Sequence, residues 1–110
     1  QAMPVVVDGW QFEQVLQNVL DNAIHFSPAG GTITVDWHLS QHETLVSIRD
    51  QGPGLAGTDS AVFDPFYSKR AGGTGLGLAI AKKIILDHQG SIRAETLSQG
   101  GTQFSIVLPR

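Results

Sequence analysis

A run of closely spaced glycines, Gly73-Thr74-Gly75-Leu76-Gly77-Leu78, leads directly into a stretch with helical character at residues 79–87. Because glycine lacks a Cβ, such a run lets the backbone approach a bound group that other residues would hold off. A helix that starts there points its free N–H groups, and the positive end of its dipole, at that group. The pattern predicts a phosphate-binding turn, with an ordinary glycine-rich surface turn as the alternative.

The composition excludes several classes of function. With 110 residues, 41% apolar and 15% charged, the chain is typical of one globular domain. We expect residues 1–110 to be a single domain taken from a longer protein. A net charge of −3 argues against nucleic-acid binding, and the absence of cysteine excludes disulfides and thiolate metal sites. No apolar run reaches membrane-spanning length, so we expect no membrane contact by this domain itself.

Hydrophobic periodicity and turn residues predict the order of the elements. The predicted strands cover residues 4–7, 33–39, 45–50, 91–97 and 102–108, and the predicted helices cover 9–26, 59–63 and 79–87. The strand at 33–39 alternates apolar and polar residues, so it is expected to be half-buried. Gly90 is expected to end the last helix as a left-handed cap. The sum is an α+β fold, a two-layer α/β sandwich whose mixed, mostly antiparallel sheet carries its helices on one face.

The first predicted helix carries two asparagines one turn apart, Asn18 and Asn22. They lie roughly opposite its apolar side, which is formed by Phe12, Leu16, Val19, Leu20 and Ala23. Asparagine is a poor residue for a helix interior. Two amide oxygens would suit Mg²⁺, which commonly takes one or two protein oxygens and completes its shell with phosphate and water. The alternative is a merely polar outer face.

Asp50 stands at the end of a predicted strand, in register with Val46 and Ile48, so its carboxylate is expected to point toward the core. A buried carboxylate is costly unless it receives hydrogen bonds. The glycines of the following turn, Gly52 and Gly54, could admit a flat ligand beside it, and a carboxylate acceptor suits the exocyclic amine of adenine. The alternative is an aspartate that caps its own turn.

Each of these motifs is a weak signal alone, but the full set in one order along the chain is a strong signal. Their order along the chain is Asn18-x-x-x-Asn22-Ala23, Asp50-x-Gly52-x-Gly54, Phe63-Asp64-Pro65-Phe66, the glycine run, and Gly101-Thr102. This set resembles the catalytic, ATP-binding domain of bacterial sensor histidine kinases, within the superfamily that includes gyrase, heat-shock chaperone and mismatch-repair ATPases and that has the Bergerat-type fold. The resemblance covers about residues 4–109.

The resemblance implies a site for ATP and Mg²⁺. Asn22 corresponds to the metal-binding asparagine, supported by Asn18, and Asp50 corresponds to the aspartate that bonds the adenine amine. The remaining residues implied to contact nucleotide are Phe26, Gly52, Gly54, Phe66, Gly73, Thr74, Gly75, Leu76, Gly77, Leu78 and Thr102. Two positions depart from the family pattern, because many relatives have Lys and Tyr where this chain has His25 and Phe26. His25, Lys69 and Arg70 are therefore the candidates for the catalytic positive charge.

The implied activity is that of a protein histidine kinase. The domain would move the γ-phosphoryl of MgATP to a histidine on the dimerisation and histidine-phosphotransfer domain of the parent protein, leaving ADP, for relay to a response regulator. Alternatives on the same scaffold are an ATP-hydrolysing clamp, an anti-sigma-type serine kinase, and a degenerate nucleotide-binding regulatory module. A clamp would need a glutamate as general base where this chain has Asn18.

Overall fold

The computed structural model describes residues 9–26, 28–52, 61–64, 76–98 and 100–109. Within these ranges the elements are α1 (Gly9–Phe26), β1 (Thr34–Leu39), β2 (Glu43–Arg49), the 3-10 turn η1 (Ala61–Phe63), α2 (Gly77–Asp87), β3 (Ser91–Thr96) and β4 (Thr102–Pro109). The predicted order is confirmed for these elements. The strand predicted at residues 4–7 lies outside the described residues.

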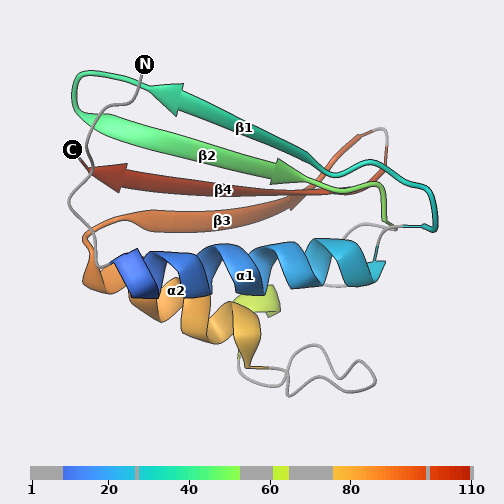
Figure 1. Ribbon diagram of the computed structural model, residues 1–110, viewed down its shortest axis with the longest axis horizontal. Coiled ribbons are helices and arrows are strands. Elements are labelled where there is room, and N and C mark those ends of the chain that lie inside the picture. Colours follow the sequence, from blue (N-terminus) through green and yellow to red (C-terminus); the bar gives the residue numbers. More distant parts are fainter. Residues whose placement is uncertain (1–8, 27, 53–60, 65–75, 99, 110) are drawn as a thin grey trace.

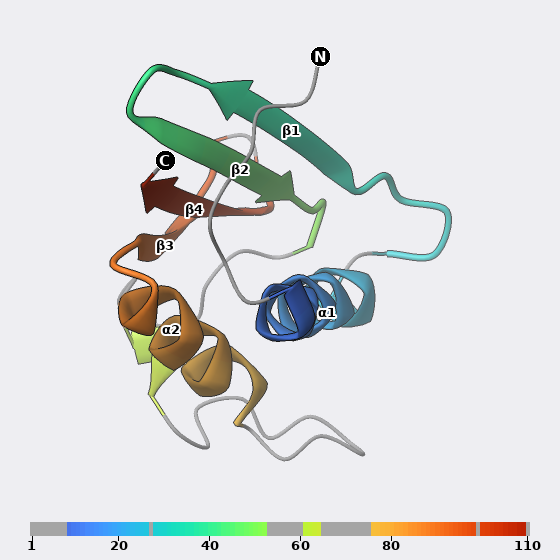
Figure 2. The same ribbon diagram turned by 60° about the vertical axis from the view of Figure 1, so that its left-hand side comes forward.

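The described strands form one sheet in the order β1-β2-β4-β3, and each neighbouring pair among them is antiparallel (Figure 1). Figure 2 shows the sheet as one layer and both helices as a second layer on one of its faces. The α+β two-layer sandwich is therefore confirmed, and no parallel pair occurs among the strands described. Within the same residues, no helix combines the length and apolarity needed to cross a bilayer.

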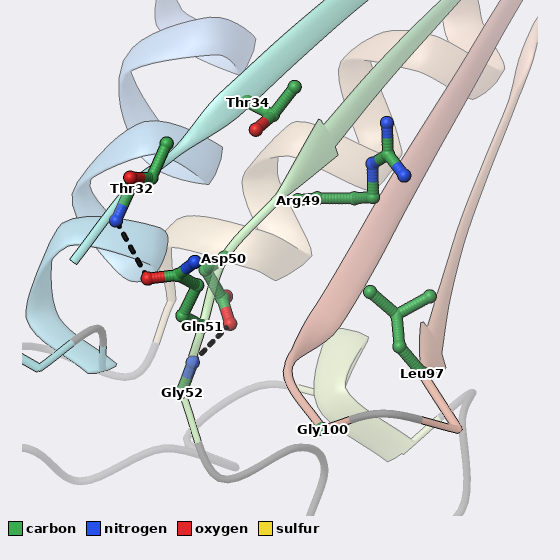
Figure 3. Close-up of a pocket in the computed structure, with 8 residues that line it drawn as sticks. All are labelled: Thr32, Thr34, Arg49, Asp50, Gln51, Gly52, Leu97 and Gly100. Carbon is green, nitrogen blue, oxygen red and sulfur yellow. Dashed lines mark hydrogen bonds between the residues drawn. The ribbon is translucent and has the colours of Figure 1, made fainter.

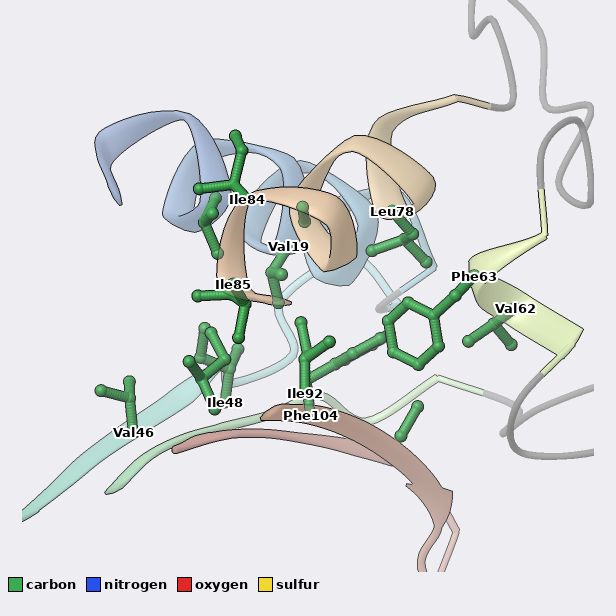
Figure 4. Close-up of a cluster of buried hydrophobic side chains, with 14 of the residues drawn as sticks. Val19, Val46, Ile48, Val62, Phe63, Leu78, Ile84, Ile85, Ile92 and Phe104 are labelled. Atoms are coloured by element: carbon green, nitrogen blue, oxygen red, sulfur yellow. The ribbon is translucent and has the colours of Figure 1, made fainter. Parts of the chain in front are cut away.

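The core lies between the sheet and the two helices (Figure 4). The central strands β2 and β4 pair Val46 with Ile106 and Ile48 with Phe104, and these side chains are buried toward the helices. The buried residues of α1 are Val15, Val19 and Ala23, while Phe12, Leu16 and Leu20 pack partly buried against the cluster. The apolar side of α1 was thus predicted correctly except for Val15, which lies at its centre.

Strand β1 differs from its prediction. Val35, Trp37 and Leu39, expected to face the core, are 41%, 53% and 41% exposed. They share the helix-side face of the sheet with their partners Ile48, Val46 and Thr44. However, β1 is the outermost described strand, and α1 packs against β2. Alternation along the chain predicted a strand correctly but could not reveal its place at the sheet edge.

The end of α2 also differs from its prediction. The left-handed residue is Gln89, with φ 64°, and Gly90 follows it with its N–H donating to Ile85 O at 2.9 Å. The Gln89 N–H donates to Leu86 O at 3.0 Å, which completes a Schellman cap. Gly90 serves a different purpose, since an added Cβ would lie 2.3 Å from Val107 O on β4. The glycine is needed for close packing of the helix end on the sheet.

Thr44 on β2 offers a test of the core. Its side-chain oxygen is buried, and within the described chain it has no hydrogen-bond partner. Because an unpaired buried hydroxyl is unfavourable, Thr44→Val should raise the free energy of unfolding by about 1 kcal/mol. Urea denaturation measures this change, which should appear as a higher midpoint concentration with the same m-value. The same substitution at the exposed Thr34 should change stability by less than about 0.5 kcal/mol. Equal effects at both positions would contradict the assignment.

Candidate functional site

Asp50 lies just beyond the end of β2 and is only 5% exposed. Its N–H donates to Thr102 O at 3.0 Å, so the β2–β4 pairing continues for one more residue. Its carboxylate oxygen Oδ1 accepts hydrogen bonds from Gly52 N at 2.9 Å and from Thr102 N at 3.1 Å. Asp50 therefore caps its own turn, as the simpler alternative predicted. It also faces inward as expected, and Oδ2 accepts no hydrogen bond from the described part of the chain.

Gly101 brings β4 into contact with Asp50. Its φ of +92° lies in the region that residues with a side chain rarely adopt. A Cβ added to it would lie 2.2 Å from Asp50 O and 3.5 Å from Gln51 Cα. The sequence motif contained this glycine, but it did not indicate that the glycine positions the aspartate.

Gln51 ties the same turn to the segment that follows α1. Its Oε1 accepts a hydrogen bond from Thr32 N at 2.9 Å. A hollow of about 450 Å³ opens beside this turn, and Figure 3 shows the residues that line it: Thr32, Thr34, Arg49, Asp50, Gln51, Gly52, Leu97 and Gly100. Thr34 and Arg49 are neighbours along their strands of Val35 and Ile48, which lie on the helix side of the sheet, so Thr34 and Arg49 lie on the opposite face. The hollow is therefore on the side of the Asp50 turn that points away from the helices.

The start of α2 lies against α1. A Cβ added to Gly77 would lie 3.6 Å from Asn18 Oδ1, so the amide of Asn18 rests on the first residue of α2. Leu76 precedes the helix and makes no side-chain cap. Since a leucine side chain has no acceptor, it cannot satisfy the N–H groups of the first turn, which favours an anion there. Leu78 points into the core and is buried.

Asn22 lies one helical turn after Asn18 and, like it, is partly buried. Neither belongs to the exposed side of α1, which is formed by Trp10, Glu13, Gln17 and Ile24. The pair therefore lies between the packed side and the most exposed side of α1. Among the described residues, no cluster of three or more His, Asp or Glu could hold a metal. A metal ion at this place would depend on amide oxygens and on oxygens of its ligand, which is a set that fits Mg²⁺.

The structure therefore brings together two groups of predicted site residues. One consists of Asp50, Gly52 and Thr102, and the other of Asn18 and Gly77, with Asn22 beside it. His25 is exposed in the last turn of α1, and Phe26 is the last residue of that helix, with a side chain outside the described part. The other predicted site residues lie outside the described residues: Gly54, Phe66, Lys69, Arg70, Gly73, Thr74 and Gly75.

Known proteins match nearly the whole chain. A family model described as histidine kinase-, DNA gyrase B- and HSP90-like ATPase matches residues 7–110. The signal transduction histidine-protein kinase AtoS of Escherichia coli (strain K12) is 40% identical over 111 residues, which cover 99% of this chain and 18% of that protein. The sensor histidine kinase WalK of Bacillus subtilis (strain 168) is 39% identical over 114 residues, covering 96% of this chain and 19% of that protein.

A solved structure is similar throughout. The mycobacterial sensor histidine kinase MprB superposes with a TM-score of 0.87 at 35% identity, covering 96% of this chain and 76% of that chain. The chain spans less than a fifth of the length of the two curated relatives. The chain therefore belongs to the histidine kinase-, DNA gyrase B- and HSP90-like ATPase family, as an ATP-binding domain of the histidine kinase type.

Proposed function

We propose that residues 1–110 form the domain that binds MgATP in a cytoplasmic part of a longer sensor kinase. The domain would pass the γ-phosphoryl group to a histidine on the parent's dimerisation domain, for relay to a response regulator. The observation that carries the proposal is the Asp50 carboxylate, which is buried and which, among the described residues, accepts two backbone N–H groups through Oδ1 and none through Oδ2. Its second oxygen is thereby left as an acceptor suited to the adenine amine.

The phosphate end of the ligand would lie at the start of α2. Asn22, supported by Asn18, would contribute an amide oxygen to Mg²⁺, whose charge helps to neutralise the phosphates. Gly73, Gly75 and Gly77 would approach the phosphates with their backbone N–H groups. His25, Lys69 and Arg70 are the side chains proposed to supply further positive charge.

Phosphoryl transfer depends mainly on positioning and charge neutralisation. A nitrogen of the acceptor imidazole forms a bond to the γ-phosphorus while the bond to the β–γ bridging oxygen breaks, and ADP leaves with that electron pair. The chain's own histidines offer no evident acceptor. None of them lies in a helix with an acidic residue directly after it, because His25 precedes Phe26 in α1, His38 lies on β1, His42 lies in the turn before β2, and His88 follows the end of α2. Phosphate incorporation by the isolated chain from labelled ATP would argue against this scheme.

Titration calorimetry with a non-hydrolysable ATP analogue, with and without Mg²⁺, tests the proposal. Micromolar to submillimolar binding that strengthens with Mg²⁺ is expected. No binding under either condition would instead favour a degenerate regulatory module. Rapid ATP turnover by the chain that is abolished in Asn18→Ala would favour a hydrolysing clamp.

Asn22→Ala should remove most of the metal dependence. In the presence of Mg²⁺ we expect analogue affinity to fall about tenfold, because one of the few protein oxygens available to the ion is lost. Without Mg²⁺ the affinity should stay within about twofold of the unmodified chain. Gln17→Ala is the matched control, since it removes an amide from the exposed side of the same helix, where Gln17 Nε2 donates to Asp21 Oδ1 at 2.7 Å. An unchanged Mg²⁺ effect in Asn22→Ala would disprove the metal assignment.

A further inference from the structure

The turn that begins at Asp50 is held differently by the two strands beside β2. On the β4 side, Asp50 N donates to Thr102 O at 3.0 Å, and Thr102 N donates to Asp50 Oδ1 at 3.1 Å. On the β1 side, the pairing with β2 ends one residue before Asp50, at Arg49 and Thr34. The backbone ladder therefore fixes Asp50 to β4 but stops short of it on the β1 side.

The side chain of Gln51 continues the link to the β1 side. In the register that pairs Thr34 with Arg49, Thr32 stands opposite Gln51, because each lies two positions beyond that pair. The Thr32 N–H donates to Gln51 Oε1 at 2.9 Å (Figure 3). A side-chain oxygen thus takes the place of a backbone acceptor, so the backbone can leave the strand direction at Gln51 while the turn stays attached.

Gly31 makes room for this bond. A Cβ added to Gly31 would lie 3.1 Å from Gln51 Oε1 and 2.9 Å from Pro28 O. Gly31 is not among the glycines with positive φ, so space rather than backbone conformation favours glycine here. The segment before β1 is therefore shaped to receive the glutamine side chain.

Gln51 is also the middle residue of the turn that orients the carboxylate. Gly52 N donates back to Asp50 Oδ1 at 2.9 Å, and this bond closes the turn around Gln51. Anchoring the Gln51 side chain therefore limits how far the turn can rotate about the end of β2. The direction of Asp50 Oδ2, the acceptor proposed for the adenine amine, depends on that rotation.

We propose that Gln51 is a positioning residue for base recognition, acting through Asp50 and not on the ligand itself. This inference rests on the proposed nucleotide function. The Gln51 side chain lines the hollow that points away from the helices, whereas Asp50 faces inward and is 5% exposed. Loss of the anchor leaves the carboxylate with several orientations, and ordering it then lowers the affinity for adenine.

The test compares dissociation constants for ADP and GDP, measured by calorimetry with Mg²⁺ below the unfolding temperature of each variant. Gln51→Met keeps the length of the side chain but removes the acceptor. It should weaken ADP binding about three- to fivefold, as expected for one lost hydrogen bond, and change GDP binding by less than about twofold. The preference for ADP over GDP should therefore shrink.

Two further variants separate the bond from other effects. Gln51→Glu keeps an acceptor for Thr32 N, and its added charge acts on both nucleotides alike, so the preference should stay within about twofold. Gln103→Met is the matched control, because Gln103 Nε2 donates to Ser105 Oγ at 3.1 Å on the sheet face that points away from the helices. A preference unchanged in Gln51→Met, or equally reduced in Gln51→Glu or Gln103→Met, would overturn the proposal.

A double-mutant cycle identifies the route of the effect. In an Asp50→Asn background, Gln51→Met should not change the ratio of ADP to GDP affinity any further. A full additional change there would mean that Gln51 contacts the base directly, which would contradict the proposed route.

Hydrogen exchange provides a measurement that needs no nucleotide. The Gly52 N–H should exchange at least about threefold faster in Gln51→Met than in the unmodified chain, and at an unchanged rate in Gln51→Glu. Unchanged exchange in Gln51→Met would also overturn the proposal. Failure of the nucleotide function itself looks different, because the unmodified chain would then bind neither nucleotide while Gly52 exchange still responded to Gln51→Met.

Discussion

Replacement of Gly101 by alanine is expected to cause the largest loss of stability of any single methyl addition proposed for this chain. The new Cβ would lie 2.2 Å from Asp50 O, and backbone atoms of Asp50 and Gln51 surround it. Unlike a flexible side chain, this backbone cannot move away without breaking the pairing between Asp50 and Thr102. The clash adds to the strain of a φ of +92°. We expect a loss of about 3–5 kcal/mol in the free energy of unfolding.

Gly100→Ala separates strain from clash. Gly100 has a similar φ of +94°, but nothing lies within 4 Å of an added Cβ. Its replacement should therefore cost only the backbone strain, about 1–2 kcal/mol. Urea denaturation gives the free energy of unfolding of both variants, and the difference between the two values is the energetic cost of the clash at Gly101. Equal losses in the two variants would mean that the approach of Gly101 to Asp50 is not close.

Asp50→Asn is expected to have the largest effect on nucleotide recognition. The amide oxygen can still accept hydrogen bonds from Gly52 N and Thr102 N, so the turn should persist. The atom left for the ligand becomes an N–H donor, which faces the adenine amine, itself a donor. We expect ADP affinity to fall about 100-fold, since a charged hydrogen bond is replaced by two opposed donors.

The change in base preference makes this prediction specific. Guanine carries a carbonyl oxygen where adenine carries the amine, so the variant amide should tolerate GDP better than the carboxylate does. The preference of the unmodified chain for ADP over GDP should therefore shrink in Asp50→Asn. Asp36→Asn is the matched control, because Asp36 pairs with Arg49 at 2.8 Å on the face of β1 that points away from the helices, where its side chain is 43% exposed, and the substitution should not affect nucleotide binding. Equal affinity of the unmodified chain for ADP and GDP would refute the role of Asp50.

Most of the fold was predictable because its signals are local. The 18-residue helix α1 has the predicted bounds, and Asp50 faces inward as its register with Val46 and Ile48 indicated. Periodicity and turn chemistry depend on residues that are neighbours along the chain, so they can be read without the fold. The contact between Asn18 and the start of α2 was not predicted, because it joins two helices that are far apart in the sequence.

The sequence by itself determined the order of helices and strands, the inward aspartate and the glycine-rich approach to α2. Only the tertiary structure decided that the apolar face of β1 is exposed, that Gly101 presses on Asp50, and that Lys82 covers Phe63. Asp50 and Thr102 are 52 residues apart in the sequence, yet two hydrogen bonds join them at the end of β2, one from Asp50 N to Thr102 O and one from Thr102 N to Asp50 Oδ1. Contacts of this kind follow from the order of strands in the sheet and from which helix covers which strand, and neither is encoded in the spacing of neighbouring residues.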